Sequence, residues 1–423
     1  MTIQRKFKHL PLLGTLTGAL LAPLSALAGQ PVWVNLGAPA FEVLRSQQPG
    51  VSSLAQRQLP VSLGARSASD TVHLVRIDED SLPRLGDALH SELRRCGGYT
   101  VHATRAEALA SLDRLSAAMT RADAVAPSYA IDNQAQVQPL INQVQDSQIL
   151  NTIQTLSAFQ NRYYKTSAGV AASDAIANNW RALAAGRSDV SVRQVTHKGW
   201  PQKSVVLTIK GTAKPAEIVV MGAHLDSIVS GPVSETTRSP GADDDASGVA
   251  SLTEVLRVMM ANGYKPRRTI ELMAYAAEEV GLRGSQAIAN SYKLGRKKVV
   301  GVLQLDMTNY EGSVNDIYLY TDYTNAAQNT FVANLAATYL PTLTVGYDRC
   351  GYGCSDHASW TGAGFAASFP FESAFNDDNP FIHTANDTLA NMGNQASHAA
   401  KFTKLALAFG IELGTDGPVA VAR

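Results

Sequence analysis

Cysteine is scarce in this 423-residue sequence, which contains only three. So few cysteines exclude a disulfide scaffold, and the core must form by burial of apolar residues, which make up 45% of the chain. In an oxidising compartment, we expect Cys350 and Cys354 to form a local disulfide that pins a glycine-rich loop. A thiolate metal site would need a further ligand pair, and Cys96 is too isolated to supply it, so a free thiol is expected there.

The sequence also lacks an excess of either charge, because Lys+Arg and Asp+Glu both number 36. No basic run or basic patch interleaved with aromatic residues stands out, so nucleic acid is not an expected partner. No Gly-x-Ser-x-Gly motif occurs either. A serine hydrolase would therefore have no nucleophile elbow in this chain.

Long apolar runs are missing everywhere except at the N-terminus. There, basic residues between positions 5 and 8 precede the apolar stretch 10–27, and Ala28 ends a small-residue cleavage pattern. Pro23 interrupts the stretch, which is also short for a membrane span. We therefore expect residues 1–28 to be a signal peptide and the protein to be secreted, without membrane association after signal cleavage.

Two regions are expected after the signal peptide. Strand-like residues 72–77 and helix-like residues 82–95 and 105–119 predict a small α+β unit. The stretch 121–138 is rich in Ala, Asp, Asn and Gln, shows no apolar periodicity, and predicts a linker that proteases could reach.

The linker divides the chain into a propeptide and a catalytic domain. We expect residues 29–125 to form an N-terminal propeptide that a processing protease removes after export, as in a zymogen. Residues 126–423 would then form the catalytic domain.

Strand-like and helix-like segments alternate after the linker. Ile149, Ile153 and Leu156 share a helical face, and several later strands are nearly continuous in apolar residues, which is typical of strands buried on both faces. This alternation predicts an α/β fold, a single globular domain whose mixed, largely parallel central sheet is flanked by helices. The expected strands are 205–209, 217–224, 269–274, 299–306, 317–321 and 366–371, and the expected helices are 248–261, 284–292, 326–340 and 399–413.

Acidic residues and histidines are concentrated where the expected strands end, which is where ligands bind in sheets of this kind. Clustered carboxylates repel one another and are costly to desolvate, so a site that gathers them needs positive charge. Imidazole together with carboxylate suits zinc, whereas calcium would not need the histidines. A carboxylate that bridges two ions about 3.5–4 Å apart is typical of two-metal hydrolases. The residues concerned are His224, Asp226, Asp243, Asp244, Asp245, Glu278, Glu279, Asp306 and His383.

Each motif alone is weak, because a His-x-Asp at a strand end is commonly structural and paired glutamates suit a helix start. Together they resemble the motifs of the secreted bacterial leucyl aminopeptidases, which use two zinc ions. The resemblance runs from about Ser147 to the C-terminus and includes the segment from Cys350 to Trp360. The matching segments are His224-Leu225-Asp226-Ser227, Gly241-Ala242-Asp243-Asp244-Asp245-Ala246-Ser247-Gly248, Ala277-Glu278-Glu279-Val280-Gly281, Leu305-Asp306-Met307 and Ile382-His383-Thr384.

The resemblance implies a ligand set for the two zinc ions. Asp244 would bridge the ions, with His224 and Asp306 on one and Glu279 and His383 on the other. Adjacent residues of a turning segment point apart, so only one of the two glutamates can easily face the metals. Glu278, the candidate general base and acid, would take a proton from the attacking water and give it to the leaving amine.

Further expectations come from the same resemblance. Asp226 would orient a ligand imidazole, and the peptide bond between Asp244 and Asp245 would be cis. Asp378 departs from the family, in which an aromatic residue is expected, and it could open the side-chain pocket or favour basic residues. The expected pocket residues are Met307, Tyr352, Phe371, Phe375 and Ile382.

The function implied is removal of N-terminal residues, preferably large apolar ones such as leucine, from peptides with a free N-terminus by a monomeric enzyme. A zinc ion or nearby carboxylate would bind the free α-amine. The alternatives are a glutaminyl cyclase-like acyltransferase, which works with one zinc, a dizinc carboxypeptidase, and a binding module that has lost ligands. His357 invites a metal or Ser-His-Asp interpretation, but the five-ligand set is complete without it. His197 and His398 are isolated and expected to be ordinary.

Overall fold

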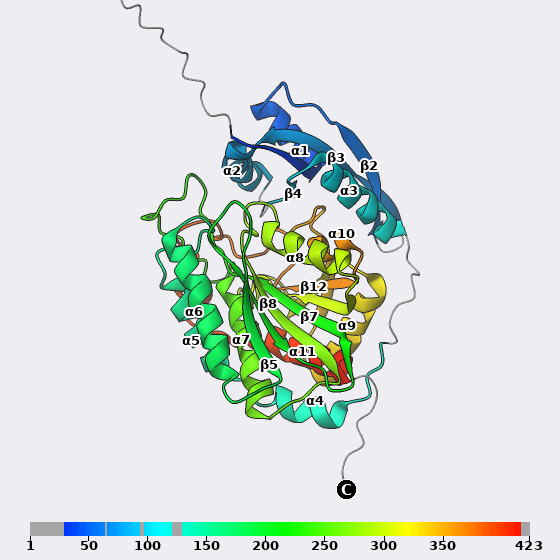
Figure 1. Ribbon diagram of the computed structural model, residues 1–423, viewed down its shortest axis with the longest axis vertical. Coiled ribbons are helices and arrows are strands. Elements are labelled where there is room, and N and C mark those ends of the chain that lie inside the picture. Colours follow the sequence, from blue (N-terminus) through cyan, green and yellow to red (C-terminus); the bar gives the residue numbers. More distant parts are fainter. Residues whose placement is uncertain (1–28, 64–65, 94–96, 121–128, 416–423) are drawn as a thin grey trace, which may run out of the picture.

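The computed structural model describes residues 29–63, 66–93, 97–120 and 129–415. They form two units, which we call the N-terminal unit (residues 29–120) and the main unit (residues 129–415). The N-terminal unit, blue in Figure 1, lies across one end of the main unit. The expected signal peptide, Cys96 and the boundary expected between residues 125 and 126 lie outside the described residues.

The N-terminal unit is the small α+β unit that the sequence predicts. Its four-stranded antiparallel sheet has the order β2-β3-β1-β4. Helices α1 and α2 cover one face of this sheet, where Val34 and Leu89 are buried. Helix α3 covers the other face and also contacts the main unit. The elements are β1 (Pro31–Gly37), α1 (Ala38–Gln47), β2 (Ala55–Leu63), β3 (Arg66–Asp78), α2 (Leu82–Leu93), β4 (Tyr99–His102) and α3 (Arg105–Thr120).

The main unit is built on an eight-stranded sheet with the order β11-β10-β12-β9-β7-β8-β6-β5. Its four central strands β12, β9, β7 and β8 run parallel, so their carboxyl ends meet at one edge. The expected mixed, largely parallel sheet is thus confirmed. The strands are β5 (Val190–Val195), β6 (Ser204–Ile209), β7 (Lys214–His224), β8 (Arg268–Tyr275), β9 (Lys298–Gln304), β10 (Ile317–Tyr320), β11 (Val345–Asp348) and β12 (Ala367–Phe371).

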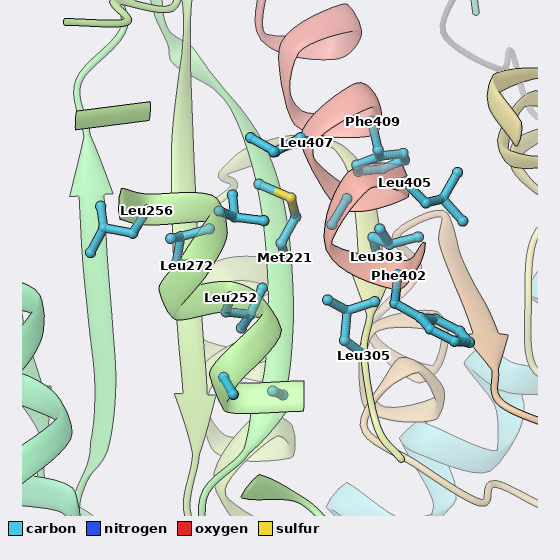
Figure 2. Packing of buried hydrophobic residues seen from close by; sticks show 14 of the residues in the cluster. Met221, Leu252, Leu256, Leu272, Leu303, Leu305, Phe402, Leu405, Leu407 and Phe409 are labelled. Atoms are coloured by element: carbon cyan, nitrogen blue, oxygen red, sulfur yellow. The ribbon is translucent and has the colours of Figure 1, made fainter. Parts of the chain in front are cut away.

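Helices cover both faces of the main sheet because its central strands are apolar on both sides. In β7, Met221 packs with α7 and α11, whereas Val220 belongs to the cluster on the opposite face with α8 and α10. Figure 2 shows Met221 from the sheet between α7 and α11. The helices are α4 (Gln134–Ile141), α5 (Asp146–Ser157), α6 (Ser167–Leu183), α7 (Ala246–Ala261), α8 (Arg283–Leu294), α9 (Ala326–Tyr339), α10 (His357–Ala363) and α11 (Ser397–Thr415).

The expectation of a linker over residues 121–138 is wrong at the C-terminal end of that stretch. Helix α4 begins at Gln134 and buries Val137 and Ile141, but its eight residues are too few to reveal a helical period, and Pro139 within it suggests a break. Residues 121–128 lie outside the described part. No helix of the described residues is long and apolar enough to span a bilayer.

Candidate metal centre and side-chain pocket

The parallel strands bring the expected ligands to one edge of the sheet. His224 ends β7, Glu279 follows β8, and Asp306 follows β9. Asp244 precedes α7, and His383 lies in the loop after β12. All five side chains are buried. They form two potential metal-binding groups, His224 with Asp244 and Asp306, and Asp244 with Glu279 and His383.

The two groups share Asp244, and each of its oxygens faces one histidine. His224 Nε2 lies 2.9 Å from Asp244 Oδ1 and 3.4 Å from Asp306 Oδ1. His383 Nε2 lies 3.2 Å from Asp244 Oδ2 and 2.9 Å from Glu279 Oε2. Ligands about 2.0–2.1 Å from a tetrahedral zinc stand about 3.3 Å apart, so this spacing fits an ion in each group.

The electrostatics of the site also fit cations. Although burial acts to lower it, Asp306, Asp226 and Asp244 hold the pKa of His224 well above its ordinary value. Burial raises the pKa of Glu279 to about 7, and Asp244 adds to this shift. Glu279 Oε1 is buried and accepts no hydrogen bond. Buried carboxylates that attract protons this strongly would be stabilised by metal ions instead.

Glu278 lies beside the ligands without belonging to either metal-binding group. Its side chain is buried and lines the same hollow as His224 and Asp244. Burial raises the pKa of Glu278 well above its ordinary value, and Glu279 contributes to the shift. A carboxyl group with a raised pKa beside a metal site can exchange protons with a substrate.

Asp226 holds the turn that carries both glutamates. Its carboxylate accepts hydrogen bonds from the backbone N–H groups of Glu278, at 2.9 Å, and Glu279, at 3.3 Å. The Nδ1 atom of His224 lies 3.2 Å from the carbonyl oxygen of Asp226 and 3.7 Å from the Asp226 carboxylate. Asp226 is therefore placed both to orient the imidazole and to position the two glutamates.

Two other buried carboxylates position ligand-bearing loops. Asp245 accepts hydrogen bonds from the backbone N–H groups of His224 and Met307, and so joins the ends of β7 and β9. Asp387 accepts hydrogen bonds from the backbone N–H of Asp243, at 3.0 Å, and of Asp244, at 3.1 Å. The Asp244–Asp245 peptide bond is cis, as the resemblance implies.

Arg162 is a buried cation beneath these loops, and the sequence analysis missed it. Its guanidinium donates hydrogen bonds to the carbonyl oxygens of Leu225, Pro240 and Gly241. It therefore ties the end of β7 to the turn that precedes Asp244.

An apolar hollow of about 440 Å³ opens beside the ligands. Of the five residues expected to line it, four do so, whereas Ile382 packs in the same apolar cluster without lining the hollow. Tyr320 and Phe369 line it as well and were not expected, because strand residues such as these resemble ordinary core in the sequence. The residues lining the hollow are His224, Asp244, Glu278, Asp306, Met307, Tyr320, Cys350, Tyr352, Cys354, Phe369, Phe371, Phe375 and Asp378.

The disulfide that the sequence predicts is present, and His357 and His197 belong to neither metal-binding group. Cys350 and Cys354 form a disulfide beside the hollow, with their Cα atoms 6.2 Å apart. His357 stacks on Phe369, with ring centroids 4.6 Å apart, and belongs to neither metal-binding group. His197 contacts Ser204 Oγ at 2.7 Å and stacks on Trp200.

The N-terminal unit reaches the metal centre. The ring of His90, in α2, lies 4.8 Å from the ring of His383 between centroids, and Asp87 accepts a 2.7 Å hydrogen bond from the Gly231 N–H. The Val101 N–H donates to the Gly281 carbonyl at 3.3 Å. Gly281 has a φ of +102°, and a Cβ there would lie 2.6 Å from Val101, so only glycine permits this approach beside the two glutamates.

Known proteins share this architecture. Residues 204–408 match the model of peptidase family M28. Leucine aminopeptidase 1 of Arthroderma otae is 37% identical over 306 residues, which are 69% of this chain and 80% of that protein. The family resemblance stated from the sequence is thus confirmed.

Two solved structures from Legionella pneumophila are similar over nearly the whole chain. LapB has a TM-score of 0.74 and 32% identity, covering 91% of this chain and 99% of LapB. The LapA aminopeptidase has a TM-score of 0.72 and 26% identity, covering 92% of this chain and 99% of LapA. This coverage exceeds the main unit and includes the N-terminal unit. The chain belongs to peptidase family M28 and is a zinc-dependent aminopeptidase.

Proposed function

We propose that the chain is a secreted aminopeptidase that holds two zinc ions and removes large, mainly apolar N-terminal residues, such as leucine, from peptides. The observation that carries the two-ion proposal is the sharing of Asp244 between two potential metal-binding groups. The apolar hollow beside those groups supports the side-chain preference. Two ions, when bound, would supply Lewis acidity for hydrolysis of the peptide bond.

Glu278 is the proposed general base and acid. It lines the hollow together with the ligands His224, Asp244 and Asp306, where a scissile bond would lie. Its raised pKa lets it hold the proton taken from water until the leaving amine accepts it. Asp226 keeps Glu278 in place through the hydrogen bond from its backbone N–H.

The acidic centre also supports specificity for a free α-amine. The substrate ammonium group would meet carboxylates that line the hollow, such as Asp244 and Glu278, which restricts cleavage to the first residue. A carboxypeptidase would instead need a cation for the substrate carboxylate, and none of the residues that line the hollow is lysine or arginine. A one-zinc cyclase would leave one of the two groups unused.

The test compares leucine p-nitroanilide with its N-acetylated analogue, using the full chain before and after limited trypsin treatment. We expect hydrolysis of the free-amine substrate alone, loss of activity on chelation, and recovery when zinc is restored. Cleavage of the acetylated substrate at a similar rate would contradict a requirement for the free amine. A zinc-loaded, trypsin-treated chain that leaves both substrates intact would contradict the function itself.

The N-terminal unit is proposed to be an inhibitory propeptide. This proposal is supported by the contacts of His90 with His383 and of β4 with Gly281, which lie directly over the metal centre. A cut within residues 121–128 would leave the unit held by noncovalent contacts alone. We expect such a cut, followed by dissociation, to raise activity at least about tenfold by uncovering the site.

The propeptide proposal and export are tested together by sequencing the N-terminus of the secreted protein. A terminus within residues 121–128 would agree with removal of both the signal peptide and the propeptide. A secreted protein that begins at Gly29 or Gln30 would contradict propeptide removal. A monomeric mature enzyme stays a prediction.

A further inference from the structure

One of the acidic residues that line the apolar hollow has no role in the proposed chemistry. The acids that line the hollow are Asp244, Asp306, Glu278 and Asp378. The first two belong to a metal-binding group, and Glu278 is the proposed base. Asp378 comes from the loop after β12 and shares the hollow with Met307, aromatic rings and the disulfide.

No described cation neutralises Asp378. Within the described part of the chain, no lysine or arginine forms an ion pair with it. Backbone amides of its own turn, at Asn376 and Asp378, support the carboxylate. The charged side chains that act on it are Asp244 and Asp377, which are both acidic. Burial and these neighbours raise the pKa of Asp378 to about 6, so the group is largely ionised at neutral pH.

A half-buried carboxylate in an apolar hollow is costly unless a cation pairs with it. Lysine and arginine side chains carry a cation at the end of an apolar stem, and they pack that stem against apolar surface. In this hollow, Met307, Phe371 and Phe375 offer such a surface, and Asp378 offers the negative charge. An N-terminal leucine would fill the apolar part and leave Asp378 without a counter-ion.

We propose that Asp378 is a specificity-determining residue that pairs with the cationic end of an N-terminal lysine or arginine side chain. The enzyme then removes basic residues as well as large apolar ones. This inference rests on the proposed aminopeptidase function. It assigns to Asp378 a contact with the substrate side chain and not with the α-amine that every substrate shares.

The experiment compares lysine with norleucine, whose side chain has the same stem without the charge. Both p-nitroanilides are assayed with the full chain after limited trypsin treatment, in wild type, Asp378→Asn and the matched control Asp377→Asn. We expect the lysine to norleucine ratio of kcat/KM to fall at least tenfold in Asp378→Asn only. Calorimetric titration with lysinamide and norleucinamide gives the corresponding ratio of binding affinities without turnover.

Three outcomes would overturn the inference. One is a ratio that Asp378→Asn leaves unchanged. Another is an equal loss of kcat/KM for the lysine and norleucine substrates in Asp378→Asn, which would assign Asp378 to a contact common to all substrates. The third is a wild type that prefers norleucine tenfold in both hydrolysis and binding. If no substrate is hydrolysed but lysinamide binding depends on Asp378, the inference stands and the proposed function fails.

Discussion

The two units of the molecule use charged side chains in different ways. The main unit gathers carboxylates at one sheet edge, and Asp226, Asp245 and Asp387 hold the backbone of the ligand-bearing loops there. At its contact with that edge, the N-terminal unit combines the ring of His90 and apolar α3 residues such as Leu112 with charged side chains, including Glu79, which pairs with Arg283 at 2.8 Å. We propose that this difference suits a metal site that keeps its geometry and a propeptide that detaches from it. The following predictions test that contrast.

The largest expected effect is on the main unit's chemistry. Glu278→Gln should lower kcat for leucine p-nitroanilide by about 10²–10⁴-fold, because general base catalysis is lost, while zinc content and Tm stay close to wild type. The control is Glu235→Gln, which alters an exposed glutamate that accepts hydrogen bonds from Ser167. A Glu278→Gln enzyme with more than a tenth of wild-type kcat would remove Glu278 from its assigned role.

The next largest effect is on stability. It is tested by comparing the loss of a buried arginine in the main unit with the loss of an exposed arginine in the N-terminal unit. Arg162→Met removes the guanidinium donor from the buried carbonyl groups of Leu225 and Pro240, and we expect it to lower the free energy of unfolding by about 3 kcal/mol or more. Arg57→Ala breaks an exposed pair with Asp113 and should cost less than about 1 kcal/mol. Urea unfolding measures both. Equal losses would contradict the structural role of Arg162.

A smaller effect is expected at the contact between the units. His90→Ala removes a ring contact with His383 that is worth about 0.5–1.5 kcal/mol, so the uncovered fraction of the uncut chain should rise about 2–10-fold. The activity of the uncut chain toward leucine p-nitroanilide measures that fraction. His73→Ala removes a matched stacking on Phe41 away from the metal centre and should leave activity unchanged. An uncut His90→Ala chain no more active than wild type would argue against the proposed inhibition by the N-terminal unit.

The smallest effect concerns acid stability of the N-terminal unit. Burial lowers the pKa of His102 to about 3 from an ordinary value of 6.5. The unfolded chain therefore takes up a proton at His102 as the pH falls below about 6.5, and the folded chain does not until about 3. The free energy of unfolding should therefore fall by about 1 kcal/mol because of His102 as the pH is lowered from 7 to 5.5.

This linkage is checked by measuring unfolding at both pH values in wild type and in His102→Gln. The glutamine retains a hydrogen-bonding oxygen for Asn35, whose side chain contacts the histidine at 3.1 Å. The variant should lose less stability on acidification. An identical pH dependence of the two proteins would show that His102 does not contribute.

Much of the main unit was predictable because its apolar strands are followed directly by the residues of the site. Edge strand β5 was not predicted, because its alternating residues are only partly buried and leave a weak apolar signal. The roles of Arg162 and Asp387 were not predictable either. Both act on backbone atoms of loops far away in the sequence, and only the fold brings these groups together.

The contact between the two units shows the same limit of sequence-based prediction. Helix α2 was expected, but nothing in its sequence indicates that His90 meets His383, because this contact depends on how the two units pack against each other. The departure at Asp378 could be seen in the sequence. Its position inside the hollow required the structure.

The most direct test of the account is a calorimetric titration of zinc into the metal-free, trypsin-treated chain. We predict two equivalents per chain for wild type and one for Asp306→Ala, because Asp306 belongs to only one of the two groups that share Asp244. Activity should reach its maximum as the second equivalent binds. Wild-type saturation at a single equivalent, with full activity, would contradict the two-ion site.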